Sequence, residues 1–257
     1  MSDLKQKKHD EPGMTLVELL IVLAVIAILC VLLFPVRFPN HRRPGMTIAR
    51  MDAAAIVQAI ASFDSNYGHF PISSNAETAA QGDLTFGTVG TGASTVIKNA
   101  GAYQANNSEL IGILCDLVKF GNGVDTPNAD HARNPRRMQF LSVPFGGDTK
   151  SHGVGPDGVF RDPWGNPYII SLDLNRDGRC RDAFYCLASV SERRRGTNEI
   201  LGLSRSKPPP FSNDAGRDSF EAKTPVMVWS FGPDGKADAS AKADEGVNRD
   251  NVVSWQP

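Results

Sequence analysis

Residues 14–36 read MTLVELLIVLAVIAILCVLLFPV, and this stretch decides how the rest of the chain is organised. Its one formal charge is Glu18, and its apolar residues would cover every face of a helix. At about 1.5 Å per residue the helix would be roughly 35 Å long, enough to cross a hydrocarbon core of about 30 Å. A helix that is apolar on all sides must be surrounded by lipid or protein. The sequence therefore predicts a membrane-spanning helix here, not the core helix of a soluble domain.

The residues on either side of this run predict its orientation. Lys5, Lys7 and Lys8 precede it, and basic residues favour the cytoplasmic side of a membrane. Arginines that follow the run weaken this bias. We expect the N-terminus to be cytoplasmic and the large C-terminal part to lie outside the cytoplasm.

The run differs from an ordinary secretory signal. Its apolar region is longer than the ~7–15 residues of such a signal, and no A-x-A-like cleavage site follows it. The basic leader ends instead at Pro12-Gly13, before the apolar residues begin. Glu18 stands at the fifth position of the run. A carboxylate at membrane depth costs about 2.5–3.5 kcal/mol on insertion scales, so such a residue is expected to have a function and a partner.

The stretch GMTLVELL, residues 13–20, resembles the prepilin-type signal of type IV pilins and type II secretion pseudopilins. The resemblance implies that a prepilin peptidase cuts between Gly13 and Met14 and methylates the new amine of Met14, where the family usually has phenylalanine. Pro35 matches a proline common near the end of this membrane helix. The chain then divides into a leader (1–13), a transmembrane and assembly helix (14–36), a linker (37–47) and an extracytoplasmic pseudopilin-like domain (48–257).

Cleavage would give Glu18 a natural partner. It creates a free amine at Met14, and in a helical stack of identical subunits Glu18 of one chain can meet the ammonium group of its neighbour. A pair relieves the cost of an isolated charge in hydrocarbon. The alternative is a tolerated glutamate that lies near the interface without a pairing role.

The rest of the chain predicts an α+β domain. Apolar residues recur at three- and four-residue steps from Ile48 to Tyr67 and predict an amphipathic helix that ends at Gly68, while the prolines and glycine of residues 37–47 predict a break before it. A short helix that is capped by Ser108 is expected to end at Gly121. The predicted strands are Tyr168–Leu172, Ala183–Ala188 and Val226–Phe231, and the predicted long loops are 72–107, 121–160 and 193–223.

Further resemblances point to the major (G-type) pseudopilin of type II secretion. They are NYGHFP at 66–71, DPWGNPY at 162–168, SFGPDG at 230–235, and Asn248–Asn251 together with Trp255. They occur in the family's order along the chain. The implied fold is pilin-like: a long N-terminal helix, with its membrane half protruding, packs on a small antiparallel sheet with long loops.

The same resemblance implies a calcium site in the C-terminal loop. Calcium takes six to eight oxygen ligands. The family's acidic positions fall on Asp234, Asn248 and Asp250, with Asn248 in place of an aspartate. Asp238 and Asp244 lie in the same loop and would compensate for the lost charge. The alternative is a solvated acidic loop.

A second candidate calcium loop contains Asp173, Asn175 and Asp177, which fit the first half of an EF-hand loop. The second half fails, because the twelfth position is Phe184 instead of glutamate. A plain turn between strands is the alternative, since turns favour the same residue types.

Four cysteines are too few for a disulfide scaffold. Cys180 and Cys186 lie in a part of the chain expected outside the cytoplasm, where disulfides form, and we predict a possible bridge between them. Spacing alone does not exclude a bridge from Cys180 to Cys115.

Composition and motifs argue against catalysis and nucleic-acid binding. The net charge is -1, from 27 basic and 28 acidic residues, whereas nucleic-acid binders are usually basic. The five histidines have no paired metal spacing, and neither a G-x-S-x-G elbow nor a P-loop occurs. We expect a non-enzymatic subunit of a type II secretion pseudopilus, anchored in the bacterial inner membrane. Its expected partners are its own copies, the prepilin peptidase, the inner-membrane secretion platform, minor pseudopilins and lipid. The alternatives are a membrane-tethered extracytoplasmic binding module and a surface or DNA-uptake pilin.

Overall fold

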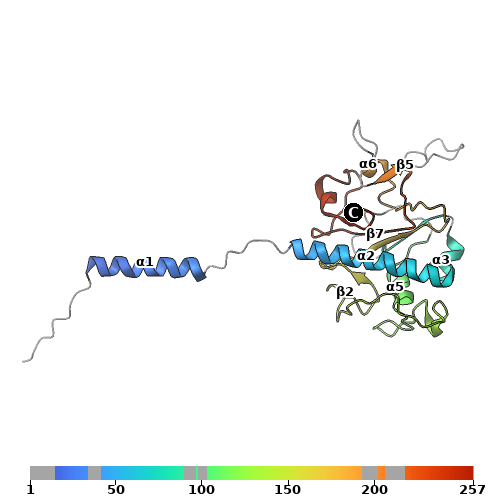
Figure 1. The fold of residues 1–257 in the computed structure, drawn as a ribbon, viewed down its shortest axis with the longest axis horizontal. Coiled ribbons are helices and arrows are strands. Elements are labelled where there is room, and N and C mark those ends of the chain that lie inside the picture. The colour runs from blue at the N-terminus through green and yellow to red at the C-terminus, as the bar shows by residue number, and fades with distance from the viewer. Residues whose placement is uncertain are drawn as a thin grey trace, which may run out of the picture. The chain divides into compact units, whose positions relative to one another are not determined.

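The computed structural model describes residues 15–33, 42–80, 82–89, 97, 103–192, 202–205 and 218–256 (Figure 1). The chain forms two compact units, residues 1–40 and 41–257. The helices are α1 (Leu16–Leu33), α2 (Arg42–Tyr67), α3 (Ser74–Ala79), α5 (Ser108–Leu114), α6 (Ala188–Ser191), η1 (Ala129–His131) and η2 (Gly246–Asp250). The strands are β1 (Leu84–Phe86), β2 (Gly153–Val154), β3 (Phe160–Arg161), β4 (Ile169–Leu172), β5 (Leu203–Arg205), β6 (Phe220–Ala222), β7 (Val226–Ser230) and β8 (Val252–Val253).

The second unit is built on one four-stranded antiparallel sheet, in the order β1-β4-β7-β8. The long strands β4 and β7 pair in the centre, with Ile169 opposite Trp229 and Leu172 opposite Val226. The predicted strands at 168–172 and 226–231 are therefore confirmed within one residue. With the N-terminal apolar helix, this sheet gives the predicted α+β class, which is consistent with a pilin-like fold.

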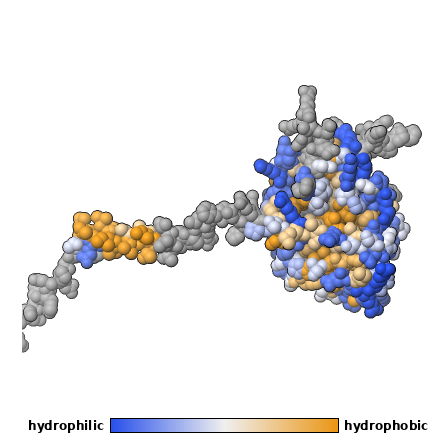
Figure 2. Space-filling view, viewed as in Figure 1, coloured by the Kyte–Doolittle hydropathy of each residue, from blue (hydrophilic) through white to orange (hydrophobic). Residues whose placement is uncertain are grey.

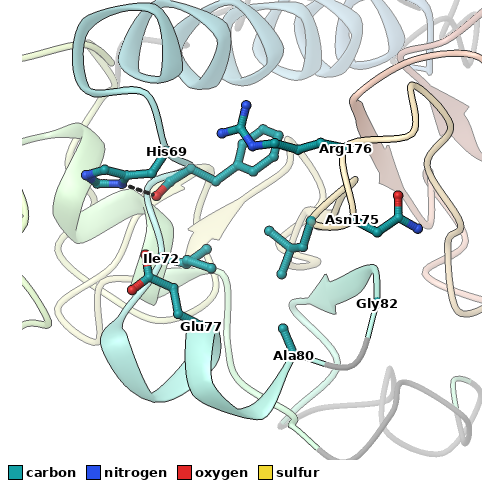
Figure 3. A pocket seen from close by; sticks show the side chains of 9 residues that line it. His69, Ile72, Glu77, Ala80, Gly82, Asn175 and Arg176 are labelled. Atoms are coloured by element: carbon teal, nitrogen blue, oxygen red, sulfur yellow. Dashed lines mark hydrogen bonds between the residues drawn. The ribbon is translucent and has the colours of Figure 1, made fainter.

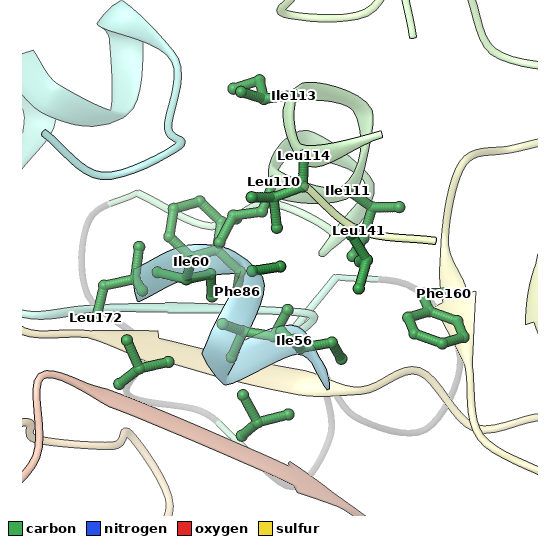
Figure 4. Packing of buried hydrophobic residues seen from close by; sticks show 14 of the residues in the cluster. Ile56, Ile60, Phe86, Leu110, Ile111, Ile113, Leu114, Leu141, Phe160 and Leu172 are labelled. Carbon is green, nitrogen blue, oxygen red and sulfur yellow. The ribbon is translucent and has the colours of Figure 1, made fainter. Parts of the chain in front are cut away.

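Both faces of the sheet are buried, because successive side chains along a strand point to opposite sides. Ile170, Leu172 and Val228 face a core that includes Ile56 and Ile60 of α2 and the apolar side of α5 (Figure 4). Ile169, Met227 and Trp229 face a second core, which the chain from Cys180 to Val190 and strands β5 and β6 complete. Burial on two sides explains why β7 reads as the continuous apolar run VMVWS.

Helix α2 begins earlier than predicted. It starts at Arg42, inside the stretch 37–47 that we expected to be a linker, and residues 34–41 lie outside the described part. Pro44 is the reason for the error, since proline is tolerated in the first turn of a helix, where its missing N–H costs no bond. By length and composition Pro44–Tyr67 passes as a membrane span, but one third of it is buried in the domain.

The predicted strand Ala183–Ala188 is wrong. Residues 183–186 form a turn that leads into α6. Asp182 accepts hydrogen bonds from the backbone N–H groups of Phe184 (2.9 Å) and Tyr185 (2.8 Å), which curls the chain. The aromatic composition of this run reflects burial in the second core, not strand pairing.

Short elements interrupt the predicted loops. Residues 72–107 contain α3 and β1, and residues 121–160 contain η1 and β2. Residues 193–223 contain β5 and β6, which pair with each other. Helix α5 also ends sooner than expected. Cys115 is its C-cap and Asp116 follows with a left-handed φ of 56°, so the helix does not continue to Gly121.

Candidate assembly site

The start of α1 places Glu18 in the first helical turn. Thr15 precedes the helix, and its hydroxyl accepts a hydrogen bond from the backbone N–H of Glu18 at 3.3 Å. Thr15 therefore caps the helix, three residues before an acid, which is the spacing of a capping box. A negative charge in the first turn is also favourable next to the positive end of the helix dipole. The sequence reasoning missed Thr15, although the pattern Thr-x-x-Glu would have identified it.

The large apolar side chains of α1 are exposed. Their exposed fractions run from 42% at Val22 to 77% at Leu16 over the described side chains 15–29. Figure 2 shows this helix almost uniformly in the hydrophobic colour. Burying one leucine or isoleucine gains about 1.5–3 kcal/mol. Such a helix therefore requires lipid or other protein around it.

Gly13 and Met14, the predicted cleavage site, lie outside the described residues.

The outward face of α2 is nearly free of charge. Between Pro44 and Tyr67, Arg50 is the one charged side chain among those classed as exposed. The exposed residues are Pro44, Thr47, Ile48, Arg50, Met51, Ala54, Ala55, Gln58, Ala61, Ser62 and Ser65. A helix that faces only water usually carries charges on that side. This face is thus suited to contact with another apolar surface.

The C-terminal segments that carry the pseudopilin resemblance meet in space. The carboxylate of Asp162 accepts backbone N–H groups of Trp164 and Asn166, both at 2.9 Å, and the hydroxyl of Ser230. The side-chain amide of Asn166 donates to the carbonyl of Gly232 at 3.1 Å. Gly232 has a φ of +69°, and a Cβ on it would lie 2.2 Å from the carbonyl oxygen of Asp250. Three segments distant in sequence therefore support one another.

The same turn contacts the start of α2. A Cβ on Gly45 would lie 2.8 Å from the indole of Trp164, so glycine allows helix and turn to approach closely. Farther along, Asp52 of α2 accepts hydrogen bonds from His152 and from the Tyr168 hydroxyl, each at 2.8 Å. These contacts fix the first half of α2 on the domain.

The candidate calcium residues of the C-terminal loop differ in how far they are buried. Asp234, Asp238 and Asp244 are exposed, whereas Asn248 is buried and Asp250 is half-buried. Within the described ranges no three acidic, histidine or cysteine side chains are grouped as a metal site. Calcium also takes amide and carbonyl oxygens, so calcium binding by this loop stays a prediction from the resemblance.

The second candidate loop has the geometry of a turn. Asp173 accepts the backbone N–H groups of Asp177 (3.2 Å) and Gly178 (2.8 Å), and Asn175 accepts that of Asp177 (2.9 Å). These oxygens thus bond to the loop's own backbone. Phe184, at the twelfth position, is fully buried and offers no ligand.

The predicted disulfide is not formed. Cys115, Cys180 and Cys186 are separate, buried thiols. Cys180 lies where the backbone pairs with Ala222, while Cys186 lies in the turn, where its thiol contacts the carbonyl of Ala183. Burial raises the pKa of Cys115 to about 12 and that of Cys186 to about 11, so both stay protonated at neutral pH. The side chain of Cys30 is outside the described part.

Asp83 is an acid that sequence reasoning missed. Burial, with repulsion from Asp173, Asp177 and Glu221, raises its pKa to about 7, although the N–H of Arg181 donates to it at 2.6 Å. Its other oxygen is buried and has no hydrogen-bond partner among the described residues. Between about pH 4 and pH 7 the folded state therefore binds more protons than the unfolded state, and stability falls as pH rises through this range.

Replacing Asp83 by asparagine should remove this penalty. We expect Asp83→Asn to raise Tm by roughly 2–4 °C above pH 7 and to leave it nearly unchanged near pH 4, where the wild-type acid is protonated. Thermal unfolding across this pH range measures the difference. Asp244→Asn, at an exposed site, is the control. An equal gain in Tm near pH 4 and above pH 7 would contradict the raised pKa of Asp83.

An open hollow of about 410 Å³ lies beside the end of α2, lined by residues that include His69, Phe70 and Arg176 (Figure 3). Its charged groups are paired within the chain. Arg176 bonds to Asp64 at 2.7 Å, and Glu77 bonds to Arg133. The ring nitrogen of His69 donates to the carbonyl of Phe70 at 2.9 Å. The hollow is therefore a recess in the surface where Arg176 and Glu77 are already paired with other side chains.

Comparison with known proteins identifies the N-terminal segment. Residues 8–34 match the prokaryotic N-terminal methylation motif, the prepilin-type signal of type IV pilins and pseudopilins. The chain thus carries a pilin-type signal in front of an α+β domain. The motif implies processing by a prepilin peptidase and self-assembly into a filament. No curated protein and no solved structure matches the chain significantly.

Proposed function

We propose that this chain is a structural subunit of a type II secretion pseudopilus, or of a closely related pilus-like filament, and that it is not an enzyme. The observation that carries the proposal is an apolar helix, exposed on all sides, with one acid in its first turn inside the matched signal. The contacts among the DPWGNPY turn, the SFGPDG segment and the C-terminal loop support the pseudopilin assignment in particular.

Processing would prepare the subunit for assembly. The prepilin peptidase removes residues 1–13 and methylates Met14, with the N-terminus on the cytoplasmic side of the inner membrane. Before assembly, lipid covers α1. The lysines of the leader support this orientation. The domain from α2 onward is then periplasmic.

Assembly would proceed through the two helices. In the filament, copies of the same chain replace lipid around α1, and Glu18 meets the ammonium group of a neighbouring Met14. The outward face of α2, which has Arg50 as its one exposed charge, would add contacts to adjacent copies. The inner-membrane secretion platform adds subunits at the base, and minor pseudopilins complete the filament. Many weak contacts, repeated along a helical array, give such a polymer its stability.

Overexpression with and without a prepilin peptidase tests this function. We expect filaments by electron microscopy only when the peptidase is present. A processed chain that stays monomeric would indicate a membrane-tethered binding module instead. Filaments that protrude from the cell surface and retain DNA would indicate an uptake pilin, which the net charge of -1 does not favour.

A further inference from the structure

The C-terminal loop is organised around one buried side chain, Asn248, which is 1% exposed. Its amide nitrogen lies 2.8 Å from the carbonyl oxygen of Asp238, 3.1 Å from that of Ala241 and 3.2 Å from that of Lys242. Its oxygen accepts the backbone N–H of Asp238 at 2.8 Å. A single side chain thus holds four backbone groups of the loop.

Three carbonyl oxygens that converge on one point repel each other unless a positive group lies between them. A bound cation does this in calcium loops, which use carbonyl and carboxylate oxygens. Here the partly positive amide of Asn248 lies at that point. The reverse orientation of the amide would turn its oxygen toward three carbonyls and its nitrogen toward an N–H group, so the network fixes the orientation.

Two acidic side chains of the loop, Asp234 and Asp238, accept hydrogen bonds from residues close to them in sequence. Asp234 accepts the backbone N–H of Lys236 at 2.9 Å. Asp238 accepts the N–H of Ser240 at 2.8 Å and its hydroxyl at 2.5 Å, and these bonds lower the pKa of Asp238. Neither carboxylate is hydrogen-bonded to Asn248, the residue that holds the loop.

We propose that the carboxamide of Asn248 takes the place of a metal ion, and that the loop over residues 233–251 folds without calcium. An aspartate at this position would present a carboxylate to three carbonyl oxygens, and it would need a cation to bridge them. We therefore expect Asn248→Asp to make the folding of this loop depend on a cation.

The full-length protein in detergent provides the test, by hydrogen exchange of peptides from 233–251 and by thermal unfolding. The wild type should give the same protection and the same Tm in EDTA, in CaCl₂ and in MgCl₂. Asn248→Asp should lose protection in EDTA and lower Tm by roughly 4–8 °C, and calcium should restore much of the loss. Asn122→Asp is the matched control, because the oxygen of exposed Asn122 accepts an N–H and its nitrogen holds no loop together.

Three results would overturn the proposal. The first is a wild-type loop that gains protection with calcium but not with magnesium. The second is an Asn248→Asp variant that matches the wild type in EDTA. The third is a variant that loses protection and does not respond to calcium, because the carbonyls would then not form a site for a cation. Even if the variant fails to fold, the wild type still tests the proposal, because its loop protection and Tm can be compared with and without calcium.

Discussion

Replacing Glu18 by alanine is expected to abolish filament formation and to leave removal of the leader intact. Glu18 is the one charge in the apolar run. In the proposed filament, pairing with the amine of a neighbouring Met14 would offset the cost of about 2.5–3.5 kcal/mol for a carboxylate at membrane depth. Without Glu18, the ammonium group of every subunit is left without its partner. The loss repeats at each contact of the polymer, so the expected effect is near-complete absence of filaments. The predicted cleavage site, after Gly13, lies five residues before Glu18, so we expect the leader still to be removed.

Electron microscopy of sheared filaments and the N-terminal mass of the membrane-bound subunit measure the two effects separately. Glu18→Gln keeps the shape and removes only the charge, so it should fail as alanine does. Val17→Ala, next to it, removes apolar atoms without changing charge and should still assemble. A normal filament yield from Glu18→Gln would exclude the charge pair and favour a glutamate that is merely tolerated near the interface.

Asp182→Ala should cause the largest loss of stability. Asp182 is fully buried between the two central strands and the second core. Its carboxylate accepts the Ser171 hydroxyl at 2.7 Å, the indole N–H of Trp229 at 3.0 Å, and two backbone N–H groups of the turn that follows it. Burial raises its pKa, and these four bonds oppose the rise. Alanine would leave four buried donors without an acceptor.

We expect this variant to lose about 3–5 kcal/mol of unfolding free energy, which lowers Tm by roughly 6–20 °C. Ser171→Ala removes one of the four donors and should cost about 1 kcal/mol. Asp244→Ala, at an exposed site, is the neutral control. Denaturant unfolding of the three variants gives the comparison. A loss for Asp182→Ala no larger than that for Ser171→Ala would show that the carboxylate does not organise the turn.

The sequence predicts best the elements that are apolar along their whole length. Helix α1 is apolar on every side, and β4 and β7 are apolar because both faces of the sheet are covered. Strand β1 was missed, since three residues in a Ser-, Gly- and Thr-rich stretch carry no periodic signal and are held by pairing with β4. The run at 183–186 looked like a strand for the opposite reason: buried aromatic residues occur there in a turn that Asp182 imposes.

The residues of the candidate site also fall into those that the sequence predicts and those that it does not. Gly13, Met14 and Glu18 could be predicted because their spacing along the chain is itself the signal. The role of Asn248 could not, because it depends on which three carbonyl groups converge in space. The resemblance to pseudopilins predicts the aspartates of the same loop as calcium ligands, and in the fold Asp234 and Asp238 accept backbone N–H groups.

The mass of the mature N-terminus, measured on protein purified from its native membrane, tests the central claim most directly. That claim is that cleavage after Gly13 creates the amine that Glu18 of another subunit neutralises. The account predicts a chain that begins at Met14 and carries one methyl group on its α-amine. A chain that still begins at Met1, without methylation, would contradict both the charge pair and the filament assignment.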